Sequence, residues 1–382
     1  MKTKTLFVAA VAAALAAVSC QRTDLVDNVL DEGTPINVVL KIGGVEAAQS
    51  RALQEDPGSS VTPELSDGVV FFYDESSGTI WGNEAIEVSE ITAGDGQIFE
   101  QISSKADMIY IVGNIPSSEL SSLKANTTIT DLKSELLSLS NQSSVEPTAV
   151  LLANTYMDSK EEYDAVIKLD DEGEDYIAKV LLAPSLSRLQ FTDITTEDSR
   201  ITSYEVAGVY VDNYHESYVP STDDYITTDP LTVGQDGSLL GTLTSQPYDV
   251  PSSAVSSTSG SVSASDFDAD SEIFGYNLTP TSSASGDGEY TPALIVKLTN
   301  IVYTDTAGET QTMETGYITV ARYSDEDGEI TAFESGTLYN IPSGSFVFDL
   351  SNITDDPNQP DVEVTVFAEV CPWVISTVTP YL

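Results

Sequence analysis

Apolar side chains occupy every second position of Ile36-Asn-Val38-Val-Leu40-Lys-Ile42. Successive side chains of an extended strand point to opposite faces, so this period predicts a β-strand with one buried face. The run ends at Gly43-Gly44, where two glycines break the pattern.

Similar apolar runs recur along the rest of the chain, with Gly, Pro, Asn and Asp between them. They cover residues 69–73, 109–112, 150–153, 165–169, 177–182, 189–191, 206–211, 239–243, 294–298, 317–321, 346–350 and 362–370. One helix is predicted over residues 130–140, because Leu132, Leu136 and Leu139 would share one helical face. The fold class is therefore predicted to be mainly β.

The strand pattern is interrupted by Ala183-Pro184-Ser-Leu-Ser-Arg188. With 382 residues, the chain is long enough for two domains after a leader. We expect two tandem β-sandwich domains of the transthyretin-like, Greek-key type, over residues 52–185 and 186–382, with one short helix in the first.

The composition excludes several classes of function. Lys and Arg number 15 against 61 Asp and Glu, which gives a formal net charge of -46. Nucleic acids and anionic lipid surfaces are therefore not expected as partners. Because 41% of the residues are hydrophobic, the chain can still bury a core and is not expected to be disordered.

No catalytic motif is present in the sequence, and no enzymatic activity and no cofactor are expected. His215, the single histidine, lies in a polar stretch and is predicted to be at the surface. Asp266, Asp268 and Asp270 imitate the start of a calcium loop, but Ser271 replaces its turn glycine. A solvated acidic loop is preferred over an irregular calcium site, and no metal is assigned.

The N-terminus has the pattern of an export signal over residues 1–19. Lys2 and Lys4 precede an apolar run, which ends in small residues and Cys20. Cleavage before Cys20 would leave its thiol free for lipid attachment; the alternative is ordinary cleavage next to an incidental cysteine. Further along, Arg51-Ala52 lies in a polar stretch with Pro and Gly, which predicts an exposed loop.

These features together resemble the fimbrillins of the Bacteroidales, the subunits of type V pili. The resemblance is carried by Cys20, the strand before Arg51, the run from Leu123 to Leu139, Ser187-Arg188-Leu-Gln-Phe-Thr-Asp, and the C-terminal Val-x-Val-x-Val with Pro372-Trp373. It spans nearly the whole chain.

The resemblance implies an outer-membrane lipoprotein precursor, held transiently by palmitate-type lipid on Cys20. An Arg-specific protease would cut between Arg51 and Ala52 and remove the propeptide over residues 20–51. The removed strand would contain Ile36, Val38, Leu40 and Ile42. A neighbour's C-terminal segment, residues 361–382, would donate a replacement strand with Val362, Val364, Val366, Val370 and Trp373.

The implied function is that of a shaft subunit in an extracellular fimbria that supports adhesion and biofilm formation. Its implied partners are identical subunits, anchor and tip subunits, the protease, and a receptor on a host or bacterial surface. The alternatives are a tip or accessory adhesin and a surface glycan-binding lipoprotein. It also remains open whether residues 362–370 instead close their own sandwich.

Overall fold

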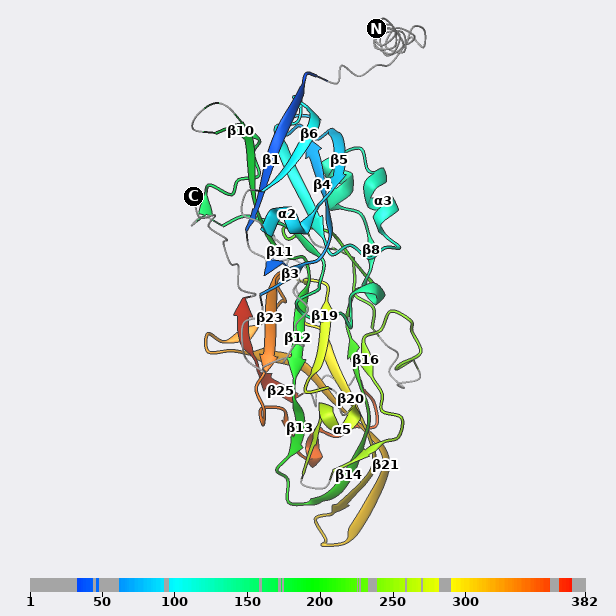
Figure 1. Ribbon diagram of the computed structural model, residues 1–382. Helices are drawn as coiled ribbons and strands as arrows, with labels where there is room; N and C mark the ends of the chain where they lie inside the picture. Colours follow the sequence, from blue (N-terminus) through cyan, green and yellow to red (C-terminus); the bar gives the residue numbers. More distant parts are fainter. Residues whose placement is uncertain are drawn as a thin grey trace, which may run out of the picture.

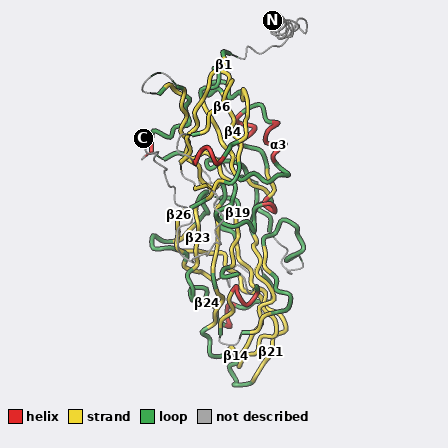
Figure 2. Tube along the Cα trace, in the orientation of Figure 1, coloured by secondary structure: helices red, strands yellow, loops and turns green. Residues whose placement is uncertain are grey.

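The computed structural model describes residues 33–43, 46–47, 62–92, 96–157, 160–170, 173, 175–224, 226, 228–232, 239–257, 260–268, 271–281, 290–357 and 364–372. Cys20, Arg51, Ala52, Val362 and Trp373 therefore lie outside the described residues. The described chain is elongated and mainly β, as predicted (Figures 1 and 2). We call residues 33–184 the N-terminal part and residues 187–372 the C-terminal part.

The N-terminal part contains one eight-stranded sheet, in the order β5-β4-β7-β9-β11-β1-β6, with β10 beside β11. The strands are β1 (Pro35–Gly43), β4 (Gly68–Tyr73), β5 (Ile80–Ala85), β6 (Gln97–Ser103), β7 (Met108–Gly113), β9 (Leu152–Thr155), β10 (Lys168–Leu169) and β11 (Tyr176–Pro184). The sheet curls until β5 and β6 approach each other. Gln97 bridges them, since its Nε2 donates to the Ala85 carbonyl at 3.1 Å. The strands of the first part thus form one hydrogen-bonded sheet that curls over its own core.

Both faces of strand β4 are buried. Along β4, Val70 and Phe72 pack inside the curl, whereas Val69 and Phe71 enter a second cluster on the outer face. A strand that is buried on both faces loses the apolar-polar alternation, which explains its uninterrupted run of apolar residues. A separate pair of two-residue strands, β2 (Glu46–Ala47) and β3 (Glu64–Leu65), lies beside the sheet.

The predicted helix over residues 130–140 is wrong in its extent. The described N-terminal part has three short helices, α2 (Val88–Thr92), α3 (Leu120–Ala125) and α4 (Ile129–Lys133), and the last begins at a Thr128 cap. From Leu137 the chain is extended as β8 (Leu137–Ser138), followed by the 3-10 turn η1 (Leu139–Asn141). Leu137 and Leu139 are buried while Leu136 is exposed, so the buried positions follow a strand period here. None of the described helices has the length and apolarity needed to cross a membrane.

The C-terminal part packs its sheets around a shared core. A four-stranded sheet has the order β19-β12-β23-β26, a three-stranded sheet β18-β13-β24, and a seven-stranded sheet β16-β14-β20-β21-β22, with β17 beside β14 and β25 beside β21. Their strands are β12 (Ser187–Phe191), β13 (Asp193–Thr196), β14 (Ile201–Asp212), β16 (Tyr248–Asp249), β17 (Val255–Ser256), β18 (Ser261–Ser263), β19 (Phe274–Leu278), β20 (Ala293–Thr304), β21 (Thr310–Ser324), β22 (Glu329–Ile330), β23 (Thr337–Ile341), β24 (Val347–Phe348), β25 (Val364–Phe367) and β26 (Glu369–Pro372). Two short helices, α5 (Ala264–Phe267) and η3 (Leu350–Asn352), complete this part. The strand predicted over residues 239–243 is wrong, because this stretch forms turns.

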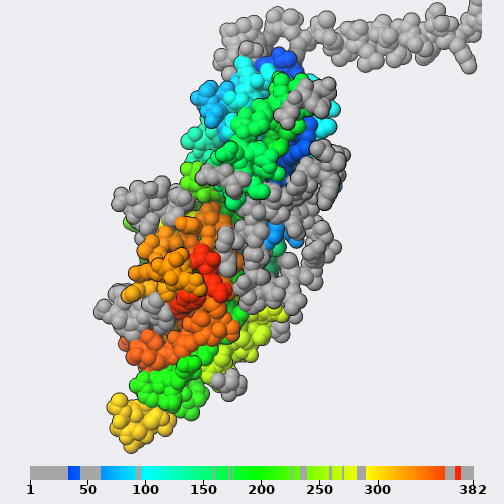
Figure 3. Space-filling view, turned by 90° about the vertical axis from the view of Figure 1, so that its left-hand side faces the viewer, coloured from blue at the N-terminus to red at the C-terminus, as the bar shows by residue number. Residues whose placement is uncertain are grey.

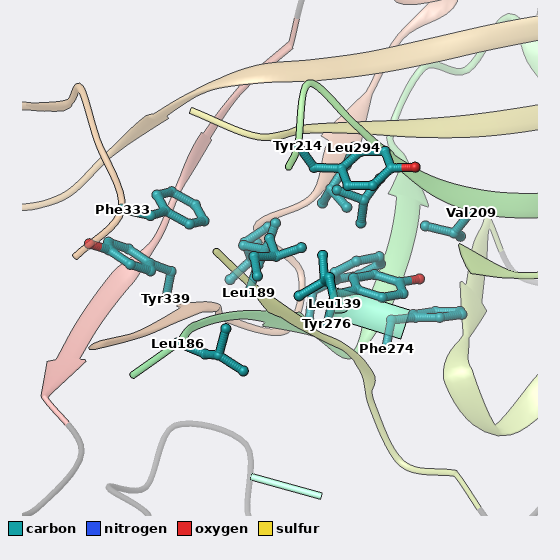
Figure 4. Packing of buried hydrophobic residues seen from close by; sticks show 14 of the residues in the cluster. Leu139, Leu186, Leu189, Val209, Tyr214, Phe274, Tyr276, Leu294, Phe333 and Tyr339 are labelled. Carbon is teal, nitrogen blue, oxygen red and sulfur yellow. The ribbon is translucent and has the colours of Figure 1, made fainter. Parts of the chain in front are cut away.

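The two parts share a hydrophobic core. Leu139 from the N-terminal part packs in one cluster with Leu189 and Tyr276 from the C-terminal part (Figure 4). β8 also pairs with β15 (Ser217–Tyr218), which joins the two parts through backbone hydrogen bonds. The chain leaves the eight-stranded sheet at Pro184 and enters the four-stranded sheet at Ser187, with no linker between them.

A buried amide also fixes this joint. Asn277 of β19 is fully buried, and its Nδ2 donates to the carbonyls of Gln142 and Val145 at 2.8 and 2.7 Å. Its Oδ1 accepts from the Arg188 guanidinium at 3.1 Å. One side chain thus satisfies groups from both parts.

We predict that Asn277→Ala lowers the free energy of unfolding by roughly 2 to 4 kcal/mol, because the carbonyls of Gln142 and Val145 lose their donor and the buried Arg188 guanidinium loses an acceptor. Asn83→Ala, on the partly exposed edge strand β5, serves as the control and should change it by under about 0.5 kcal/mol. Urea unfolding of both variants measures the difference. Equal losses in the two variants would contradict the role of Asn277.

Candidate functional site

β1 lies between two strands that it holds together. It pairs in parallel with β11, from Val38 with Tyr176 to Gly43 with Leu181, and antiparallel with β6. Among the described strands, β6 pairs with β1 alone. Without β1, the sheet would carry a groove with an unpaired backbone edge on each side.

The inward face of β1 supplies the four apolar side chains that the sequence period identified. Val38, Leu40 and Ile42 are 0%, 1% and 6% exposed, and Ile36 is partly buried. They pack inside the curl in one cluster with Phe99. The floor of the groove is therefore aliphatic and aromatic.

Gly43, at the end of β1, and Gly96, before β6, allow β1 to approach its neighbours closely. Gly96 has φ of +83°, and a Cβ there would stand 2.5 Å from the Leu40 carbonyl oxygen. A Cβ on Gly43 would stand 3.0 Å from side-chain atoms of both Leu181 and Tyr163. Any residue other than glycine at the Gly43 position therefore needs these two side chains to shift, and a small side chain needs the least shift. The sequence analysis missed Gly96 and Tyr163; Gly96 leaves only a weak signal in the sequence, a glycine directly before a strand.

The outer face of the groove carries a different chemistry. Val39 stands opposite Ile98 of β6 and Ile177 of β11, and Ile98 is 59% exposed. Lys41 stands directly opposite Lys179. Like charges in directly opposed positions of a sheet destabilise the pair. The Lys179 ammonium lies 3.3 Å from a Glu162 carboxylate oxygen.

The single strand predicted over residues 362–370, within the donor segment 361–382, is broken in the structure. β25 pairs in parallel with β21, whereas β26 pairs antiparallel with β23 of a different sheet. The change occurs at Ala368, whose amide donates to the Ser324 carbonyl at 2.8 Å. One strand cannot belong to both sheets of a sandwich, so the chain turns between them.

This C-terminal segment is only partly buried. Val366 and Ala368 are 1% and 0% exposed and belong to the core of their own part, whereas Phe367 and Val370 are 39% and 40% exposed. The segment lies on the surface in Figure 3, as a red band beside the orange strands. In this conformation it closes its own sandwich, which is the arrangement that the sequence left open.

The surface position predicted for His215 is wrong. Its side chain is 5% exposed and meets the Tyr290 ring edge-on at 5.7 Å, because the following strand β15 is clamped against β8. Burial lowers the pKa of the imidazole below its usual value, so it is neutral near pH 7.

The polar residues near His215 do not form a catalytic arrangement. A hollow of about 520 Å³ beside it is lined by Leu136, Glu216 and Asp229, among others. Glu216 accepts from the Ser245 hydroxyl at 2.5 Å, while the described residues give the His215 Nε2 no partner. No nucleophile and base are paired among the described residues of this hollow.

Trp81 and Asp266 have structural roles. Trp81 packs against the cluster inside the curl, and the Lys105 ammonium lies 4.9 Å from its ring centroid. Asp266 caps α5, because its carboxylate accepts from the Ser263 amide at 2.8 Å. Neither residue lies on the strands β1, β6 and β11 that form the groove.

No family model and no curated protein matches the sequence. Solved structures do match its fold. A candidate cell adhesion protein from Bacteroides eggerthii DSM 20697 is 14% identical, with a TM-score of 0.52 over 90% of this chain and 96% of the other. A candidate cell adhesion protein from Parabacteroides distasonis ATCC 8503 is 13% identical, with a TM-score of 0.52 over 89% and 99% of the two chains.

A fimbrilin from Porphyromonas gingivalis W83 also matches, at 11% identity and a TM-score of 0.49, over 91% of this chain and 100% of the other. The first two matches span nearly the whole of both chains at low sequence identity. The chain therefore has the fold of these two candidate cell adhesion proteins.

Proposed function

We propose that this protein is a structural subunit of a surface fimbria, which polymerises when β1 leaves its groove and a neighbour's C-terminal segment replaces it. The observation that carries this proposal is the position of β1. It is the first described strand of the chain, yet it lies inside the sheet between β11 and β6. A strand at the start of a chain can be removed by a single cut after it.

The loss of β1 exposes apolar side chains and unpaired backbone groups, so binding of a replacement strand is strongly favoured. Three fully buried aliphatic side chains each contribute about 1.5 to 3 kcal/mol, and the backbone ladders to two neighbours are lost with them. Such a groove favours an extended peptide that restores both ladders, as in β-strand addition. The cut belongs at Arg51-Ala52, which the sequence places in a polar loop after β1.

The C-terminal segment is suited to donation by its position and its exposed side chains. It consists of two four-residue strands, and β26 is the last strand of its sheet. Phe367 and Val370 remain partly exposed while the segment is held in its own part. Donation requires Val366 and Ala368 to leave their core, and burial in the neighbour's groove offsets that loss.

The rest of the assignment follows from the leader and the fold. Lipid on Cys20 would hold the precursor at the outer membrane until an Arg-specific protease releases it. The mature chain then joins identical subunits, with separate anchor and tip subunits at the ends of the fibre and a receptor on another cell. Its role is adhesion and biofilm formation, and it performs no catalysis.

A tip subunit is the second candidate function, and one observation favours it. Val366 and Ala368 already complete the core of their own part. A tip subunit accepts a strand and has no need to donate one. The two candidates differ in whether the C-terminal segment leaves its own sheets.

We predict that Arg51→Ala blocks maturation and polymerisation together, because β1 stays in its groove. N-terminal sequencing and SDS-resistant ladders measure the two effects. Arg22→Ala is the control, since a cut at Arg22 would leave β1 in place. Normal ladders from the Arg51→Ala variant would refute strand removal at this bond.

We predict that Val370→Asp folds normally but does not polymerise. The side chain is exposed in the monomer, so the free energy of unfolding should change by under about 0.5 kcal/mol. In a neighbour's groove the same position would be buried, and an unpaired carboxylate there is very costly. Val250→Asp, at another exposed valine, controls for added charge. Full polymer from the Val370→Asp variant would show that Val370 does not enter a neighbour's groove, whereas a cleaved parent chain that forms no polymer either would favour the tip-subunit role.

A further inference from the structure

The structure assigns a register to the exchange: residues 364–371 of a second copy replace residues 36–43 one for one, and Glu369 takes the place of Lys41 opposite Lys179. This inference rests on the strand exchange proposed above. It adds which residue of the incoming strand meets which residue of the groove.

The groove fixes the direction and the facing of any strand that fills it. To restore the β1 ladders, a donor must run parallel to β11 and antiparallel to β6. Its inward side chains must be apolar, because they replace Val38 and Leu40 in the core. The C-terminal segment satisfies this with Val366, Ala368 and Val370 on one face of an extended strand.

Charge selects among the possible registers. In the present state Lys41 opposes Lys179, a like-charge pair. In the assigned register Glu369 takes the Lys41 position and gives an opposite-charge pair with Lys179. Opposite charges in this geometry stabilise a sheet and like charges destabilise it. The incoming strand is therefore better matched to the outer face of the groove than the strand it replaces.

The exposed apolar side chains also meet in this register. Phe367 takes the Val39 position, between Ile98 and Ile177. Phe367 is 39% exposed in the monomer and Ile98 is 59% exposed. The contact would cover two apolar side chains, one from each copy, that the monomer leaves in water.

At the Gly43 end of the groove, the size of the incoming side chain distinguishes the registers. The residue that takes the Gly43 position meets Leu181 and Tyr163, which must shift for any side chain because even a Cβ would be at 3.0 Å, so a smaller side chain costs less here. The assigned register places Cys371 there, one of the smallest side chains of the segment. A shift of two residues would instead place Glu369 or Trp373 at this point.

The two shifted registers fail on the outer face as well. If Val362 took the Ile36 position, Phe367 would stand opposite Lys179. If Val366 took it, Glu369 would stand between Ile98 and Ile177, and Pro372 would enter the core side without an amide to donate. Ala368 faces inward in all three registers, so it does not distinguish them.

Disulfide trapping between copies tests the register. In a Cys371→Ser background, Ile98→Cys is combined in turn with Thr365→Cys, Phe367→Cys or Glu369→Cys, and the full precursor is cleaved at Arg51 by an Arg-specific protease. The three pairs report the three registers, because the Val39 position faces Ile98. A register shift of two residues moves the cysteine about 6.6 Å along the strand, which takes the two Cα atoms beyond the distance that a disulfide can bridge. Covalent ladders should form with Phe367→Cys and not with the other two.

Charge reversal provides a second measurement. Glu369→Lys alone and Lys179→Glu alone should each reduce polymer by at least about fivefold, and the double variant should regain most of it. Lys124→Glu, on α3 away from the groove, is the matched control for a charge change. Melting of each uncleaved precursor shows that the monomer is intact.

The outcomes separate the register from the proposed function. Suppose that polymer forms but disulfide-linked oligomers appear with Thr365→Cys or Glu369→Cys, or with none of the three variants. This result overturns the register and leaves strand exchange standing. Absence of polymer from the cleaved parent chain overturns strand exchange itself. Intact single variants that lose polymer without rescue in the double variant overturn the Lys179–Glu369 pairing.

Discussion

The backbone pairing of β1 with β11 and β6 is the constraint on which the rest of the N-terminal part depends. β6 has no other strand partner among the described residues, and the cluster inside the curl is completed by side chains of β1. A buried strand carries two rows of hydrogen bonds, and neither neighbour can leave its polar groups unsatisfied. The loss of the first described strand would therefore leave β6 with no strand partner among the described residues and β11 with an unpaired edge.

The sequence located strands correctly where the spacing of apolar side chains followed one period over several residues. The alternation in Ile36 to Ile42 identified β1 and its inward face, an uninterrupted apolar run located β4, and an apolar run broken by Lys179 located β11. It failed where tertiary contacts replaced the local period. Leu136, Leu137 and Leu139 suit a helix by spacing, but the pairing of β8 with β15 makes the chain extended there.

The candidate site shows the same limit. Polar neighbours suggested that His215 lies at the surface, and only the joint between the two parts explains its burial. The run of valines near the C-terminus predicted one strand, whereas the chain crosses between two sheets at Ala368. The roles of Gly96 and Tyr163 depend on distances across the groove, which no local pattern contains.

The rigid joint and the high negative charge together restrict how such chains can associate. The N-terminal part holds the groove and the C-terminal part holds the segment proposed to fill a neighbour's groove, and their shared core fixes the distance between the two. Residues 1–51 contain five basic and five acidic side chains, so their removal would leave the net charge unchanged. Repulsion between mature chains is then as strong as between precursors, and cleavage cannot promote assembly through net charge. It must act by opening a site whose local contacts outweigh that repulsion, through backbone ladders, buried aliphatic side chains and opposite charges placed face to face.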